Sequence, residues 1–561
     1  MADARKPQRR TRRRKSKLKT RLSRWWSRLE ASFPRFGRIS GQRKPAGADS
    51  DGDVNLVVKN SANHSILVAA RNIYLQAPAA VIPLAVVFAI AVIAGSIAVI
   101  QSVNPTSAAP RFSAGSPYVL DMVVMPFRAA APNDPACRAL AAELPVELTA
   151  SIQRQFESNA SGEGATSSVK VWSPGQTGIQ AETTDAAYAA QAKHLVANQG
   201  ADIVLYATVF CNDAQLTVVP RFDLAPTYLR DAPEYQGTYD LGAFSSDIMQ
   251  PNDTVASTVI RRELANRAAS LAMLVQGLAH LARQTYASYL DASAAFGQIA
   301  LLNPPPDNQT LAVAHIFAGN ASLQAATGDC SNSLNSDLLE QAAGHYQAAL
   351  SFEPQAALAY LGLGNVMNLR AFYESGANAQ AAHRYLDMAE AFFASALSAG
   401  VKPSAVILDN KVRYGQAQAH IIRREFTSNQ AESAALLDRA EAAITELLDD
   451  YRAGKIRSPS APSLAAYAYL MMGNIHLARE NYEAALFNLL SAAKLAQDAE
   501  TKSLIAAKTA VVQNQINDFC AAAVQYQIAA DNARCEDDRL NYTLLARDYQ
   551  IECESISSSR P

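Results

Sequence analysis

A long stretch of the chain, between Arg71 and Arg111, carries no charged residue. Its centre, residues 78–100, is almost wholly apolar, and 23 residues in a helix span about 35 Å, against about 30 Å for the hydrocarbon core of a bilayer. A buried helix of a globular domain rarely runs so long without a polar face, and a cleaved signal peptide would start closer to the N-terminus. The sequence therefore predicts an uncleaved transmembrane helix over residues 78–102.

Charge is distributed unevenly around this predicted helix. Residues 1–77 contain 19 Lys/Arg and 5 Asp/Glu, although the whole chain has a formal net charge of -1. Because basic residues stay on the cytoplasmic side, we expect the N-terminus in the cytoplasm and the C-terminal part exported. This predicts a single-pass protein of a bacterial plasma (inner) membrane. The 6 cysteines all follow the predicted helix, which is compatible with disulfides in an oxidising compartment.

The N-terminal tail, residues 1–45, begins with a basic block over residues 5–19 that is expected to be disordered. Apolar residues then recur at helical spacing between basic ones, which favours binding to an anionic membrane surface. The residues expected at that surface are Trp25, Trp26, Arg21, Arg24 and Arg28. Two alternatives stay open: the charge only sets the topology, or, least favoured, it binds nucleic acid phosphates. Residues 46–77 contain two short apolar runs typical of a β-hairpin, with no assigned role.

Residues 117–250 alternate between strand and helix patterns. Strands are predicted over 118–127, 169–172, 200–210 and 215–222, with helices over 134–158 and 183–198. This β-α-β-α-β-β order implies an α/β sandwich with a partly parallel sheet.

Three short motifs in this part match one known domain: Val-Met-Pro-Phe ending at Phe127, Gln199–Tyr206 and Leu216–Phe222. Together they resemble the amino-terminal domain of TolB and the TolB-like modules that precede tetratricopeptide (TPR) repeats. The resemblance implies a protein-interaction module without catalytic residues. The chain departs from the family at Cys137, which opens the first helix, and Cys211, which ends the third strand. They are a candidate disulfide, with two buried thiols as the alternative.

From residue 253 the chain becomes rich in alanine and helical in pattern. Residues 253–303 form a long helical connector that stops at Asn303-Pro-Pro-Pro. Over residues 309–555, a Gly-Asn pair follows an apolar helical start at Gly319, Gly364 and Gly473. This pattern resembles the TPR, with a generic helical bundle as the alternative. The expected packing positions of the repeats are Gly364, Tyr360, Gly473, Tyr482, Ala485 and Ala492.

A TPR stack binds peptides or other domains on its concave face. The candidate residues of that face are Tyr373, Arg370, Arg413 and Tyr414, although each is equally an ordinary packing or surface residue of a repeat.

Signatures of hydrolases, metalloproteases, nucleotide-binding loops and kinases are absent from the sequence, and the 8 His are scattered. We therefore expect no enzyme activity, no metal and no cofactor. The predicted chain is multidomain: one transmembrane helix, an α/β domain and an all-α TPR-like solenoid. Its expected function is that of a membrane-anchored scaffold that binds protein or peptide partners outside the cytoplasm. The alternative is a transmembrane sensor whose basic tail engages a cytoplasmic effector.

Overall fold

The computed structural model describes residues 120–159, 169–212, 215–225, 233–247, 254–283, 285–303, 305–327, 334–374, 378–456 and 461–557. The described residues lie in one compact unit. The predicted transmembrane helix 78–102, the basic tail 1–45 with Trp25, Trp26, Arg21, Arg24 and Arg28, and the segment 46–77 lie outside them.

The structure corrects the predicted fold class in one respect. Among the described residues, no helix is both long enough and apolar enough to cross a membrane. A single transmembrane helix is therefore not part of the fold that the structure presents. That fold is a mixed α/β part followed by a mostly helical, TPR-like part.

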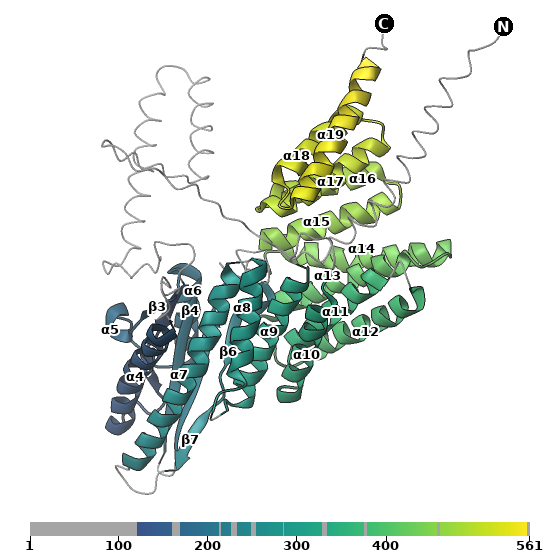
Figure 1. Cartoon of the computed structure of the whole chain (residues 1–561). Coiled ribbons are helices and arrows are strands. Elements are labelled where there is room, and N and C mark those ends of the chain that lie inside the picture. Colours follow the sequence, from purple (N-terminus) through teal and green to yellow (C-terminus); the bar gives the residue numbers. More distant parts are fainter. Residues whose placement is uncertain are drawn as a thin grey trace, which may run out of the picture. The chain divides into compact units, whose positions relative to one another are not determined.

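The α/β part contains a mixed sheet (Figure 1). Its strands are β1 (Leu120–Val124), β2 (Arg128–Ala129), β3 (Val169–Trp172), β4 (Ile203–Cys211), β5 (Gln215–Leu224), β6 (Gly237–Asp240) and β7 (Phe244–Asp247). The main path runs β3-β1-β4-β5-β6, while β2 pairs with β4 and β7 with β5. Strands β3, β1 and β4 are parallel, and β5 is antiparallel to β4 with Ile203 opposite Leu224.

Helices cover both faces of this sheet. On one face lie α4 (Pro135–Asn159) and α7 (Thr254–Ala282), which pack against each other and whose apolar residues share a core with Met122, Val124 and Leu205. On the other face, α6 (Asp185–Asn198) buries Tyr188 and Leu195 against alternate residues of the same strands. Thr184 caps α6 by accepting a hydrogen bond from the Ala187 N–H. A short helix, α5 (Pro174–Thr177), precedes α6.

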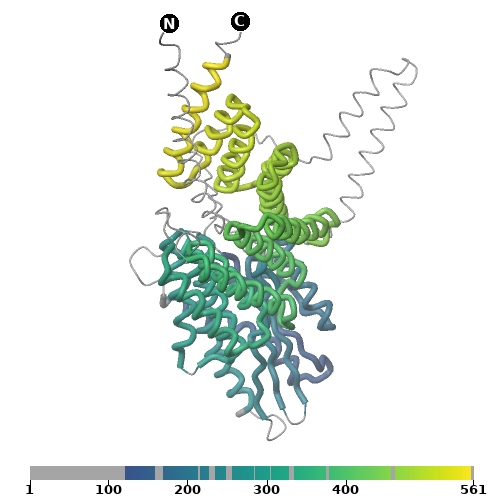
Figure 2. The backbone as a smooth tube through the Cα atoms, turned by 90° about the vertical axis from the view of Figure 1, so that its right-hand side faces the viewer, coloured from purple at the N-terminus to yellow at the C-terminus, as the bar shows by residue number. Residues whose placement is uncertain are grey.

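The helical part is a succession of antiparallel hairpins (Figure 2). After α8 (Tyr286–Ile299), the helices are α9 (Asn308–Thr327), α10 (Ser336–Phe352), α11 (Ala357–Glu374), α12 (Ala379–Ser398), α13 (Ala405–Arg424), α14 (Gln430–Arg452), α15 (Ala461–Ala478), α16 (Tyr482–Leu495), α17 (Ala499–Gln515), α18 (Phe519–Asn532) and α19 (Glu536–Ser557). The hairpins are α9–α10, α11–α12, α13–α14, α15–α16 and α17–α18, and α19 packs on α18. The first helices of successive hairpins also meet: α9 with α11, α11 with α13, and α15 with α17.

Asparagine and aspartate start many of these helices. The side chains of Asn335, Asn378, Asn429, Asn481 and Asp518 accept hydrogen bonds from backbone N–H groups at the starts of α10, α12, α14, α16 and α18. Such a cap is worth about 1 kcal/mol and fixes where the second helix of each hairpin begins. The repeat register is thus set by short polar side chains as well as by the core.

Candidate interaction surface

Glycines in the first helix of a hairpin accept a large side chain from the second helix. A Cβ atom on Gly364 would overlap the ring of Phe393, and one on Gly415 of the next hairpin would lie 2.5 Å from the same ring. The ring of Tyr346 is held in the same way between Gly319 and Gly362. Each ring therefore joins two hairpins, because it occupies space that only glycine leaves free on both sides.

The other predicted packing positions lie in the same layer or at its edge. Ala485 and Ala492 are fully buried, and a Cβ on Gly473 would lie 2.8 Å from Leu489 Cγ. Tyr482 is half-buried at the start of α16. The Tyr360 hydroxyl donates a hydrogen bond to the carbonyl oxygen of Pro354, 3.1 Å away, and so closes the turn before α11.

The structure separates the residues predicted for the partner-binding face. Tyr414 is 1 % exposed and packs edge-on against Tyr467, so it cannot contact a partner, which corrects the expectation for that residue. It lies in the core that residues of α13, α14 and α15 form together. Arg370 pairs with Glu340 of α10, and Arg413 lies 2.9 Å from Glu446 of α14. Tyr373 is half-buried at the edge of the core.

The first helices of the hairpins form one side of the stack, which we call the inner side. Over the first hairpins, another segment of the same chain covers this side. The short helix η1 (Pro233–Tyr235) and strand β6 lie against α9 and α13. The rings of Tyr235 and Tyr239 pack on Phe317 of α9, with centroids 5.3 and 5.7 Å away. The Tyr235 hydroxyl reaches the Tyr346 hydroxyl of α10, 3.4 Å away. Burial raises the pKa of both tyrosines, so these hydroxyls stay protonated at neutral pH.

Two contacts with charged side chains hold the segment 233–242 against the helices. Lys411 Nζ of α13 lies 3.3 Å from Glu234 Oε2, with side chains 6 % and 9 % exposed. Arg267 of α7 donates hydrogen bonds to the carbonyl oxygens of Leu241 and Gly242 and pairs with Asp307, 2.8 Å away, just before α9. The α/β part and the first hairpins thus share one continuous hydrophobic core, closed by buried polar contacts.

Sequence analysis missed the residues of this contact. Their signal was present, because Lys411 lies within Ile407-Leu-Asp-Asn-Lys-Val412, where its neighbours predict a buried helix face. A lysine there calls for a buried acid, but the sequence does not say that the acid is Glu234.

Past α13 a cleft remains open. It is lined by Tyr467 of α15, by Glu500, Thr501 and Leu504 of α17, by Arg534 in the turn before α19, and by Asp538 and Tyr542 of α19. The Tyr467 and Thr501 hydroxyls lie 2.9 Å apart, which fixes the ring at the wall of the cleft. Hydrophobic, acidic and basic side chains thus face one cleft. We call this the terminal cleft.

A pair of histidines lies between α9 and α10. His315 and His345 approach with Nδ1 atoms 3.1 Å apart, and burial lowers both pKa values, that of His345 to about 4. Within the described ranges, no group of three or more His, Cys, Asp or Glu side chains is arranged to hold a metal ion. The histidine pair therefore packs α9 against α10 in neutral form.

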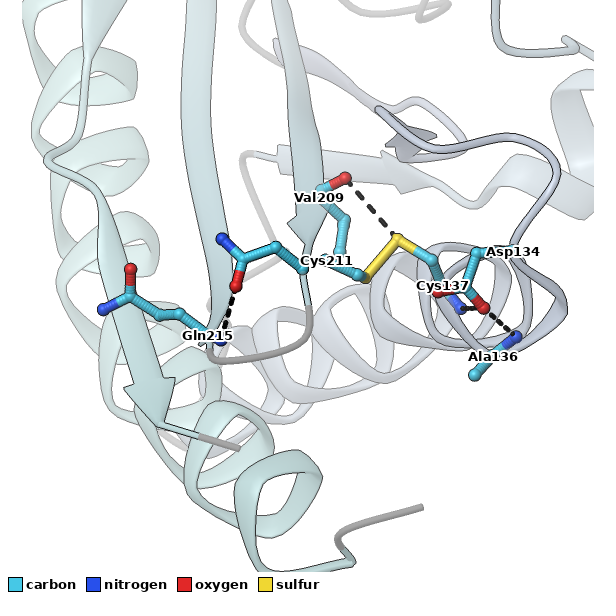
Figure 3. The surroundings of a disulfide bond; sticks show 7 residues. Asp134, Ala136, Cys137, Val209, Cys211 and Gln215 are labelled. Carbon is cyan, nitrogen blue, oxygen red and sulfur yellow. Dashed lines mark hydrogen bonds between the residues drawn. A yellow bond between two sulfur atoms is a disulfide. The ribbon is translucent and has the colours of Figure 1, made fainter. Parts of the chain in front are cut away.

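The structure brings Cys137 and Cys211 together in a disulfide (Figure 3). It links the start of α4 to the end of β4, and Asp134 Oδ1 caps α4 by accepting from the Ala136 and Cys137 N–H groups. Cys137 Sγ also lies 3.7 Å from the Val209 carbonyl oxygen, a close contact rather than a hydrogen bond because a bridged sulfur carries no proton. A second disulfide, Cys520–Cys553, joins α18 to α19.

No protein-family model matches this chain, and no curated protein matches it in sequence. Among solved structures, the TPR protein TTC0263 of Thermus thermophilus aligns at 14% identity with a TM-score of 0.28, covering 37% of this chain and 91% of that chain. Yeast Tom70 aligns at 13% identity with a TM-score of 0.24, covering 55% of this chain and 67% of that chain. The TPR-like character of the helical part rests on the pairing of its own helices. The resemblance of the α/β part to TolB stays a prediction.

Proposed function

We propose that this chain is a non-enzymatic scaffold whose helical hairpins bind an extended peptide segment of a protein partner in the terminal cleft. The observation that carries the proposal is that one part of the inner side of the hairpins is covered by the chain and another part is open. From α9 to α13 that side is filled by the segment 233–242, whereas the cleft between α15, α17 and α19 is open.

The lining of the cleft suits an extended peptide. Tyr467 offers an aromatic surface, Arg534 is exposed and can pair with an acidic group, and Asp538 can accept from a backbone N–H or a basic side chain. Recognition by a few polar groups beside an apolar wall gives orientation together with affinity. The peptide would place backbone between α15 and α17 and charged side chains towards the start of α19.

The disulfides Cys137–Cys211 and Cys520–Cys553 support a location in an oxidising compartment, because such bridges persist there and are reduced in the cytosol. We propose that the described part of the chain works outside the cytoplasm. Trapping thiols in intact cells and then labelling the unfolded protein tests this. Cys137 and Cys211 should remain unlabelled before reduction, and free thiols at both positions would contradict it.

Selection of random peptides on the purified full-length chain tests the binding function. Peptides that bind should bind at least tenfold more weakly to Tyr467→Ala and to Arg534→Glu. Arg384→Glu is the matched control, since Arg384 is exposed on α12 away from the cleft. Peptide binding that is indifferent to both cleft changes would refute the terminal cleft as the site.

A further inference from the structure

The last helix of the stack, α19, has two apolar faces. Its inner face buries Tyr542, Ala546 and Tyr549 against α17 and α18. On the opposite side, Leu540, Leu544 and Ile551 are 57%, 51% and 56% exposed. At about 100° per residue, these three lie within an arc of about 40°, and the buried residues lie roughly opposite.

An apolar outer stripe is unusual at the end of a helical stack. A terminal helix normally presents a polar outer face, which keeps the stack soluble and stops further stacking. Single exposed leucines need no explanation, but aligned ones mark a contact surface. We call Leu540, Leu544 and Ile551 the outer stripe.

The hairpin pattern indicates what kind of element covers the outer stripe. In each preceding hairpin the first helix, such as α15 or α17, packs along an antiparallel second helix. Helix α19 follows α18 and packs along it, and among the described residues no further helix covers its outer stripe. The geometry therefore calls for one helix, lying antiparallel to α19.

The charged residues beside the outer stripe indicate the charge of the partner helix. Glu536, Glu554 and Arg547 flank one side of the outer stripe, and Asp537 and Asp548 flank the other, by helix periodicity, so the flanks carry four acidic residues and one basic residue. Over its whole length α19 carries six Asp/Glu against two Lys/Arg. A second copy of α19 placed antiparallel on the first would bring Glu536 opposite Glu554 on the same flank, so like charges would meet.

We propose that the outer stripe of α19 binds a cationic amphipathic helix of a partner protein, which completes the last hairpin. The bound helix, which runs antiparallel to α19, presents apolar residues at i, i+7 and i+11 to Ile551, Leu544 and Leu540, and Lys or Arg to the acidic flanks. Helix-in-groove recognition of this kind reads apolar anchors at helical spacing. This surface is separate from the terminal cleft, so the two can be tested independently.

The probe is a synthetic helical peptide with leucines at this spacing and lysines on both flanks, titrated by fluorescence anisotropy into the full-length chain. A second peptide carries glutamate in place of every lysine. We expect saturable binding of the lysine peptide, weakened at least tenfold by Leu544→Asp and by raising the salt concentration, and no binding of the glutamate peptide. Leu490→Asp on α16 is the matched control, because Leu490 is 46% exposed on another helix.

Several results would overturn the proposal. One is equal binding of the two peptides, or unchanged binding to Leu544→Asp. Another is an equal loss in the Leu490→Asp control. A third is a concentration-dependent dimer in sedimentation that Leu544→Asp dissolves, since the outer stripe would then be covered by a second copy. Thermal unfolding of each variant checks folding, and Leu540→Ser serves as the second variant if Leu544→Asp unfolds.

Discussion

The ring of Phe393 occupies the space that a side chain on Gly364 would need. The two residues belong to the second and first helices of one hairpin, and Gly415 of the next hairpin touches the same ring. Close packing of this kind cannot absorb an added methyl group without moving backbone.

Gly364→Ala should therefore destabilise the chain although alanine is the better helix former. Overpacking costs about 1–3 kcal/mol, which exceeds the gain of about 1 kcal/mol in helix propensity. Gly344→Ala is the matched control, because Gly344 is helical and exposed and a Cβ there meets nothing within 4 Å. Calorimetry should show a lower melting temperature for Gly364→Ala and an equal or higher one for Gly344→Ala. A neutral Gly364→Ala would mean that Phe393 does not lie against it.

Ala485→Leu tests the same layer further along the chain. Ala485 is fully buried near Gly473 and Leu489, so a leucine there should cost about 1–3 kcal/mol. Glu483→Leu is the control, since Glu483 is exposed on the same helix. Glu480 would be a poor control because its φ is 59°, a conformation that strains most side chains. Hydrogen exchange in Ala485→Leu should rise in α15–α19 more than in the sheet, and an equal rise throughout would contradict a nearest-neighbour stack.

Local patterns in the sequence place much of the described fold. Strand β3 has the bounds that its alternation of Val and Trp predicts, and α6 lies within the helix predicted over residues 183–198. The strands β6 and β7 were missed, because Gly237–Asp240 and Phe244–Asp247 are short and polar and are held by pairing with β5. Their formation depends on a neighbour that is distant in sequence.

The candidate surface was predicted less well than the fold, for a related reason. Repeat patterns identify the glycines and alanines that pack, but they do not reveal that Glu234 and Tyr235 fill the inner side of the first hairpins. Tyr414 shows the limit, since an aromatic residue beside an arginine was expected on the surface and lies in the core. Which face of a helix is open depends on what packs there, and that information is not local.

The Cys137–Cys211 and Cys520–Cys553 disulfides should differ in how easily they are reduced. Cys520 is exposed at the end of the stack, whereas Cys137, in the first turn of α4, is 1% exposed. Exchange requires a thiolate to reach a sulfur atom, so access governs the rate. As the concentration of a thiol reductant is raised, the Cys520–Cys553 bridge of the folded chain should be reduced first. Alkylation of the free thiols followed by peptide mass spectrometry measures this. In urea both bridges should open together, and simultaneous release in the folded chain would contradict the difference in access.

Acidification should destabilise the first hairpin through His345. Burial, followed by the neighbouring His315, lowers the pKa of His345 to about 4, against about 6.5 in an unfolded chain. Between these values the unfolded chain binds more protons, so the free energy of unfolding falls as the pH drops from about 6.5 towards 4. His345→Gln should flatten this part of the melting-temperature profile, whereas His194→Gln, at an exposed site on α6, should not. Identical profiles for His345→Gln and the wild type would show that His345 titrates normally.

The pair of Lys411 and Glu234 offers the sharpest test of the contact between the α/β part and the helical hairpins. Both side chains are buried, so Lys411→Met leaves the Glu234 carboxylate in the core without its partner. Loss of one member of a buried pair costs about 3–5 kcal/mol. Arg539→Met is the matched control, because Arg539 and Glu536 are 59% and 87% exposed and such a pair contributes about 1 kcal/mol or less.

Adding Glu234→Leu to Lys411→Met removes the orphaned charge, so the double variant should recover most of the lost stability. Urea unfolding of the wild type, of Lys411→Met, of Glu234→Leu and of the double variant gives the coupling energy between the two residues. Hydrogen exchange shows where the structure opens. We expect the single variant to raise exchange in η1, β6 and α13 together, because Glu234 and Lys411 hold these elements to each other. If Lys411→Met is as mild as Arg539→Met, or if exchange rises in α13 alone, the segment 233–242 does not fill the inner side of the first hairpins, and a partner could bind there as well as in the terminal cleft.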